Sequence, residues 1–156
     1  MRATFGFLLI WSCVACSNTA RGISHIDSVK TSDKFLGGSC LGTMWSPTDY
    51  TLEHIRRGDQ ELMILKKCTN GRDSRKPNCR AVASLKLPVL IEGQRVAFGL
   101  LGCSEEGHWD SAIIAVVTDP VGEPRPHVER AWRAMPEKAV FQEIPSEGIQ
   151  CGGQND

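Results

Sequence analysis

Ser111-Ala-Ile-Ile-Ala-Val-Val-Thr118 is the most strongly β-forming stretch of the chain. Isoleucine and valine favour strands, because their branched side chains pack well on a pleated surface. An uninterrupted apolar run is typical of a strand that is covered on both faces. The run ends at Asp119-Pro120, which is a turn signal. We therefore expect residues 111–118 to form a central, buried strand of the domain.

Shorter strand-like segments flank this central strand on both sides. They are, in chain order, residues 61–66, 80–87, 89–91, 95–101, 128–134 and 139–144. Glu92-Gly93-Gln94 predicts a tight hairpin turn between the third and fourth of these segments. The last two predict a closing hairpin about residues 135–138. Short strands with short connections indicate an antiparallel meander.

One segment has a helical pattern instead. Ser46-Pro47-Thr48-Asp49 offers a helix start, Leu52 and Ile55 share one helical face, and Gly58 offers a stop. The spacing predicts a short helix that ends at Arg57. The predicted fold class is therefore mainly antiparallel β (α+β with one short helix), in a single small domain.

The N-terminus has the charge pattern of an export signal. Met1-Arg2 supplies a positive charge, and the next stretch, through Cys16, is uncharged and largely apolar. Its length of about 14 residues suits a signal segment, since a membrane-spanning helix needs about 20. We expect residues 1–15 to be a signal peptide, a tether of residues 16–38 to follow, and residues 39–156 to form the β domain.

The cleavage site carries a second prediction. Val14-Ala15-Cys16 is similar to the end of a lipoprotein signal, although Cys13 stands where leucine is usual. Cys16 is therefore the predicted lipid attachment residue. The membrane is the predicted partner of the chain, bound through this lipid anchor. In lipoproteins generally, a non-acidic residue such as Ser17 in the next position implies the outer membrane, facing the periplasm. Ordinary cleavage after Ala15 or Ala20, giving a soluble periplasmic or secreted protein, is the alternative.

Composition limits the classes of function. The chain has 156 residues, with 18 Lys and Arg against 18 Asp and Glu, so its net charge is zero. A nucleic-acid partner is not expected, because the basic footprint of such proteins is absent. Residues 17–38 are polar and rich in serine, glycine and threonine. Such a composition is typical of a flexible linker, which would lift the domain off a membrane surface.

The cysteines predict a disulfide framework, since an exported chain meets an oxidising compartment. Seven cysteines stand at 13, 16, 40, 68, 79, 103 and 151. Cys68 and Cys79 flank a long turn between two predicted antiparallel strands, so we expect them to form a disulfide. The spacing does not choose a pairing among Cys40, Cys103 and Cys151. A free Cys16 would allow a third disulfide, whereas a lipidated Cys16 would leave one spare thiol.

The polar cluster of residues 103–110 is the strongest candidate for chemistry. A thiol, a carboxylate and an imidazole lie close together in Cys103, Glu105 and His108, a set that could form a metal site or a thiol nucleophile with its base. The spacing fits no closed zinc pattern, so we interpret the cluster as a polar hairpin loop with Cys103 in a disulfide. His54 and His127 are isolated and are interpreted as surface residues. No catalytic residue, metal or cofactor is predicted.

Two further sequence features have structural interpretations. Arg57-Gly58-Asp59 is the tripeptide that some adhesion receptors recognise, but such short matches occur by chance, and Gly58 already serves as the helix stop. The three tryptophans Trp45, Trp109 and Trp132 could build a binding patch. Core or strand-face positions are the more usual role of such side chains.

The C-terminal stretch resembles a known group of sequences. Ala131-Trp132-Arg133, Ile144-Pro145 and Gly148-Ile149-Gln150-Cys151 are similar to the closing segment of small, uncharacterised exported proteins and lipoproteins of proteobacteria. The resemblance covers about 30 residues and implies an envelope protein that ends in a hairpin. It implies no activity.

Together these features predict an envelope-anchored bacterial lipoprotein that binds a partner or supports the envelope without catalysis. Its protein partner is not specified by the sequence. An inhibitor or immunity protein against a periplasmic or secreted hydrolase is the alternative, since small, disulfide-linked domains suit that task. An exported hydrolase is the third class considered.

Overall fold

The computed structural model describes residues 30, 32–42, 47–69, 78–99, 102–122 and 125–152. The predicted signal peptide, Cys16 and the predicted tether up to residue 29 lie outside these ranges. No described residue lies in a helix. The strands are β1 (Lys34–Gly42), β2 (Pro47–Arg57), β3 (Gln60–Thr69), β4 (Asn78–Lys86), β5 (Gln94–Phe98), β6 (Cys103–Glu105), β7 (His108–Trp109), β8 (Ile113–Thr118), β9 (His127–Met135), β10 (Val140–Ile144) and β11 (Ile149–Cys151).

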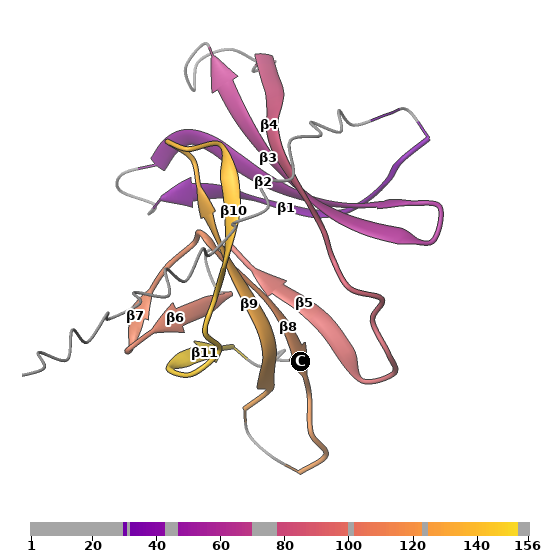
Figure 1. The fold of residues 1–156 in the computed structure, drawn as a ribbon, viewed down its shortest axis with the longest axis vertical. Helices are drawn as coiled ribbons and strands as arrows, with labels where there is room; N and C mark the ends of the chain where they lie inside the picture. Colours follow the sequence, from indigo (N-terminus) through magenta and orange to yellow (C-terminus); the bar gives the residue numbers. More distant parts are fainter. Residues whose placement is uncertain are drawn as a thin grey trace, which may run out of the picture.

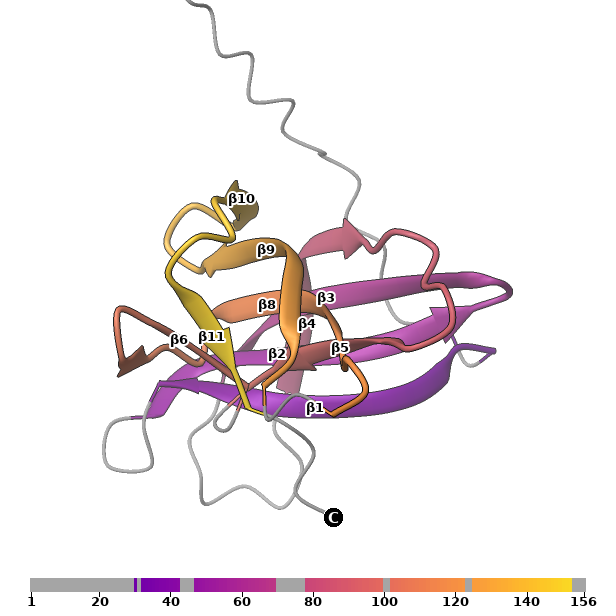
Figure 2. The same ribbon diagram turned by 90° about the horizontal axis from the view of Figure 1, so that it is seen from below.

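The strands form three antiparallel sheets. The first sheet is the meander β1-β2-β3-β4, the second has the order β10-β9-β8-β5, and the third is the small sheet β11-β6-β7. In Figure 1 the first sheet occupies the upper half of the molecule; β5 and β8 of the second sheet lie in the lower half, and the β9–β10 hairpin extends up alongside the first sheet. Seen from below in Figure 2, the second sheet lies across the first. The predicted mainly antiparallel β class is therefore confirmed.

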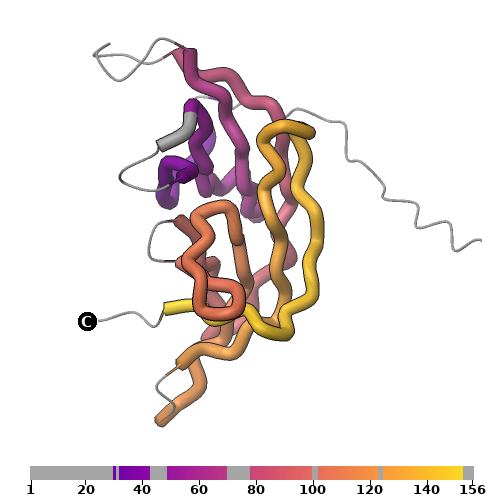
Figure 3. The backbone as a smooth tube through the Cα atoms, turned by 90° about the vertical axis from the view of Figure 1, so that its left-hand side faces the viewer, coloured from indigo at the N-terminus to yellow at the C-terminus, as the bar shows by residue number. Residues whose placement is uncertain are grey.

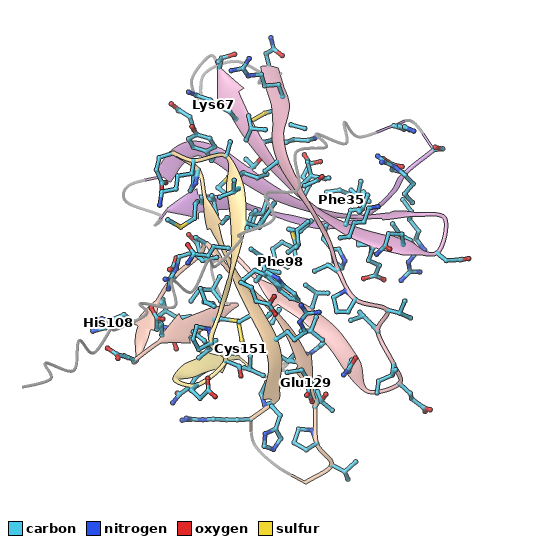
Figure 4. All side chains as sticks on the ribbon, in the orientation of Figure 1. Phe35, Lys67, Phe98, His108, Glu129 and Cys151 are labelled. Carbon is cyan, nitrogen blue, oxygen red and sulfur yellow. A yellow bond between two sulfur atoms is a disulfide. The ribbon has the colours of Figure 1, made fainter. Side chains whose placement is uncertain are left out.

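The main core fills the space between the first two sheets. Leu52, Met63 and Leu65 of the first sheet are fully buried against Ile114 and Trp132 of the second. Phe98 at the end of β5 packs against this core, and Figure 4 shows it near the centre of the molecule. Burial of such side chains contributes about 1.5–3 kcal/mol each relative to exposure. Packing between the sheets is therefore the main stabilising interaction of the domain.

The third sheet covers the opposite face of the second. Cys103, Ile149 and Cys151 of the third sheet pack against Ala115 and Val117 of β8. Because β8 lies between β9 and β5 and is covered on both faces, all its residues from 113 to 117 are buried. The prediction of a central, buried strand at residues 111–118 is thus confirmed, and so is the closing hairpin, which is β9–β10.

The two large sheets also approach each other at their edges. β10 lies beside β4, as Figure 3 shows for the yellow arm of the β9–β10 hairpin. At the opposite edge, Gly99 after β5 lies so close to β1 that an added Cβ would come within 2.6 Å of the Ser39 hydroxyl. The backbone N–H of Gly42 in β1 donates a 2.8 Å hydrogen bond to the Ser111 hydroxyl. These contacts fix β1 and β4 against the second sheet.

The predicted helix ending at Arg57 is wrong, because this segment is β2. β2 pairs along its length with β1 on one side and with β3 on the other. Leu52 and Ile55 are three residues apart and therefore lie on opposite faces of the strand. Both faces are buried there, since Leu52 belongs to the main core and Ile55 packs with Leu62 and Ile64. Gly58 is not a helix stop but adopts a φ of 57° in the β2–β3 turn.

Two other boundaries differ from the sequence interpretation. Residues 89–91 form no strand, and β5 pairs with β8 rather than with this segment. The predicted hairpin about Glu92-Gly93-Gln94 is therefore wrong, although the turn itself is present. Residues 34–38 of the predicted tether belong to β1, which pairs with β2. This register places the exposed side chain of Phe35 opposite Ile55, in the upper part of the view in Figure 4.

Candidate functional site

The structure places the predicted cluster of residues 103–110 in the β6–β7 hairpin. Cys103 is disulfide-bonded to Cys151, so its sulfur is neither a thiolate nucleophile nor a metal ligand. The side chain of His108 is exposed, and Figure 4 shows it at the left-hand edge of the molecule. The interpretation of the cluster as a polar hairpin with a bridged Cys103 is confirmed.

The carboxylates of this hairpin are held by one arginine. Arg133 donates from Nε to Asp110 at 3.0 Å and from Nη2 to Glu105 at 2.7 Å. Partial burial alone would lower the pKa of Arg133, but the hydrogen bond to Glu105 and the charge of Asp110 raise it overall. The second oxygen of Asp110 accepts the Ala112 N–H. These interactions attach the hairpin to β9 and give the carboxylates a structural role.

Two disulfides each join directly opposed strand residues. Cys68 and Cys79 face each other across β3 and β4, which confirms the predicted pair. Cys103 and Cys151 face each other across β6 and β11, a pairing that the spacing left open. The Cα atoms are 4.0 Å apart in both pairs. Among the described cysteines, Cys40 on β1 is the free one, and it is exposed.

A buried histidine lies on the inner face of the first sheet. His54 is only 8% exposed, so its interpretation as a surface residue is wrong. Its Nε2 donates to Glu61 at 2.8 Å, and its ring meets Phe98 edge-on at 6.0 Å between centroids. Burial lowers the pKa of His54, against the opposing effect of the hydrogen bond to Glu61. The imidazole is therefore neutral at pH 7.

Glu61 links this histidine to the surface. Its other carboxylate oxygen accepts hydrogen bonds from Nε and Nη2 of Arg56. Partial burial would raise the pKa of Glu61, but the hydrogen bonds from Arg56 and His54 lower it overall. Glu61 is therefore a carboxylate at neutral pH, and it is the least exposed charged group of the pocket described next.

A pocket of about 510 Å³ opens beside the β2–β3 turn. Figures 1 and 2 both show this turn next to the connection from β4 to β5. One wall is polar and the other is an aliphatic stretch. The lining residues are Arg56, Asp59, Gln60, Glu61, Pro88, Val89, Leu90, Ile91, Glu92 and Gln94.

The sequence did not predict this pocket. Residues 89–91 were interpreted as a strand, and the β2–β3 turn was interpreted as a helix end. The sequence carries no local signal for the pocket, because the exposure of Val89 and Ile91 is seen only in the structure. The remaining wall comes from residues about 30 positions earlier in the chain, and the pairing of β3 with β4 brings them there, since Leu62 lies opposite Lys86 and the Leu87 N–H donates to the Glu61 carbonyl.

The other candidate residues are placed as follows. Arg57 donates two hydrogen bonds to Asp33, at 2.9 and 2.8 Å, so the arginine of Arg57-Gly58-Asp59 is engaged within the domain. Trp132 is buried in the core, Trp109 is 61% exposed, and Trp45 lies outside the described residues. His127 begins β9.

Comparisons with other proteins give no family. No family model matches the chain, and no curated protein and no solved structure matches it. Within the described ranges, no three or more histidine, cysteine or acidic side chains are grouped so that they could hold a metal ion. In the same part of the chain, no helix is long and apolar enough to cross a membrane.

Proposed function

We propose that this chain is an exported bacterial lipoprotein of the cell envelope, whose β domain binds a partner without catalysis. The observation that carries the proposal is the pair of disulfides between directly opposed strand residues. Structural disulfides form and persist in oxidising compartments, which an exported chain enters. The charge-then-apolar pattern of residues 1–15 supports the same destination.

The lining of the pocket is suited to binding. It places the charged and amide groups of Arg56, Asp59, Gln60 and Glu61 near the aliphatic side chains of residues 89–91. The carboxylate of Glu61 is held by Arg56 and His54 and keeps a lowered pKa, which does not suit a general acid at neutral pH. A pocket with one polar wall and one aliphatic wall is well suited to hold a ligand in one orientation.

The anchor is tested by intact mass and detergent partition of the native protein beside Cys16→Ala. We expect a diacylglycerol adduct and partition into detergent for the wild type, and neither for Cys16→Ala. Cys40→Ala is the matched control, because Cys40 is an exposed free thiol elsewhere in the chain, and it should keep the adduct. An unmodified wild type that begins after Ala15 or Ala20 would refute the lipid anchor.

A further inference from the structure

The connection between β4 and β5 has an unusual surface. Val89 is 83% exposed and Ile91 is 68% exposed, whereas Leu90 between them packs against the main core. Side chains that alternate in this way belong to an extended backbone. The segment therefore presents two aliphatic side chains on the same side, toward solvent, at the edge of the pocket.

The backbone of this segment is held at its two ends. At one end, the Leu87 N–H donates to the Glu61 carbonyl at 3.0 Å. At the other end, the Ile91 carbonyl accepts from the Gln94 N–H at 3.0 Å. Between them, the peptide groups of Val89 and Leu90 have no hydrogen-bond partner among the described residues. An extended segment with open peptide groups can pair with another extended chain.

The polar wall is acidic. Asp59 and Glu92 are exposed carboxylates at the rim, and Glu61 lies deeper. The pocket's cationic side chain, Arg56, already donates to Glu61, so its charge is compensated. The uncompensated charge of the rim is therefore negative and favours a cationic ligand group.

We propose that this pocket binds an extended peptide segment in which a lysine or arginine side chain stands beside aliphatic residues. The peptide backbone pairs with the open peptide groups at Val89 and Leu90. Its aliphatic side chains contact Val89 and Ile91, and its cationic side chain reaches Asp59 and Glu92. The inference rests on the binding role proposed above and is independent of the lipid anchor.

The test uses three capped pentapeptides of the same length, Val-Lys-Val-Lys-Val, Val-Gln-Val-Gln-Val and Val-Glu-Val-Glu-Val. Each is titrated into the ¹⁵N-labelled full chain carrying Cys16→Ala, and amide shifts report both affinity and location. We expect saturable shifts at residues 59–61 and 88–94 with the lysine peptide. The glutamine and glutamate peptides should bind at least about ten-fold more weakly, because they cannot pair with the acidic rim.

Two sets of substitutions test whether the carboxylates of Asp59 and Glu92 bind the lysine side chains of the peptide. Asp59→Asn combined with Glu92→Gln should weaken the lysine peptide by about ten-fold or more and leave the glutamine peptide unchanged. Glu137→Gln is the matched control, because Glu137 is an exposed carboxylate in the β9–β10 turn and does not line the pocket. It should change neither affinity.

Equal affinities for the three peptides, absence of binding, or shifts confined to other surfaces would overturn the inference. These results are separable from those on the anchor. A lipidated protein that binds no peptide contradicts this inference alone. An unmodified Cys16 together with saturable lysine-peptide binding contradicts the anchor alone.

Discussion

Removal of the Cys103–Cys151 disulfide should cost more stability than removal of Cys68–Cys79. The first closes a loop with a sequence separation of 48 and the second one of 11. In the chain-entropy model these separations correspond to about 4 and about 3 kcal/mol. Packing acts in the same direction, because Cys103 and Cys151 are buried between β6, β11 and the second sheet, while Cys68 and Cys79 are half-buried.

The assay is urea unfolding of two double-alanine variants, Cys103→Ala with Cys151→Ala and Cys68→Ala with Cys79→Ala, followed by tryptophan fluorescence. Both variants carry Cys16→Ala and Cys40→Ser, so that no free thiol between residues 16 and 156 exchanges with the remaining disulfide. We expect the first variant to be less stable than the second by about 1 kcal/mol or more. Equal losses, or a larger loss in the second variant, would refute the reasoning.

Three further predictions concern individual contacts. Burial lowers the pKa of His54 below the unfolded value of 6.5. The free energy of unfolding of the wild type should therefore fall as the pH drops from 6.5 towards the folded-state pKa. In His54→Gln this pH-dependent loss should be absent when urea midpoints are compared from pH 8 to 5. Gly99→Ala should destabilise more than Gly93→Ala: both glycines have a φ near 84° (84° and 83°), but an added Cβ meets Ser39 at 2.6 Å only in the first case. We expect about 1–2 kcal/mol from the backbone in both and about 1–3 kcal/mol more for Gly99→Ala, measured by urea unfolding, and equal losses would contradict the close contact. Arg133→Met should lower global stability by less than about 1 kcal/mol, since its ion pairs are partly exposed, but should accelerate amide exchange in β6 and β7; unchanged exchange there would contradict the role given to this arginine.

Much of the fold could be predicted from local pattern. The apolar run of residues 112–117 indicated a strand covered on both faces, and the structure places it between β9 and β5 with a sheet on each side. Cys68 and Cys79 could be paired because a short segment of sequence separates them between adjacent antiparallel strands. The disulfide could be predicted because its two cysteines are near each other in sequence. The buried strand could be predicted because its residue types are apolar and β-branched.

The residues around the pocket and His54 could not be predicted from local sequence pattern. β2 has apolar residues at a spacing that fits a helix, and only its pairing with β1 and β3 makes it a strand with two buried faces. His54 looked like a surface residue because nothing near it in sequence indicates that Phe98 covers it. Propensity is a weak local preference, and tertiary pairing overrides it.

The sequence by itself determined the β class, the central strand, the closing hairpin and one disulfide, because periodicity and short-range spacing carry that information. It also supplies the predictions of export and of a lipid at Cys16, which depend on residues outside the described ranges. Only the tertiary structure decided that Cys103 pairs with Cys151 and that the β2–β3 turn meets the β4–β5 connection at a pocket. Both are contacts between segments distant in the chain, and such contacts follow from how the sheets pack rather than from local preference.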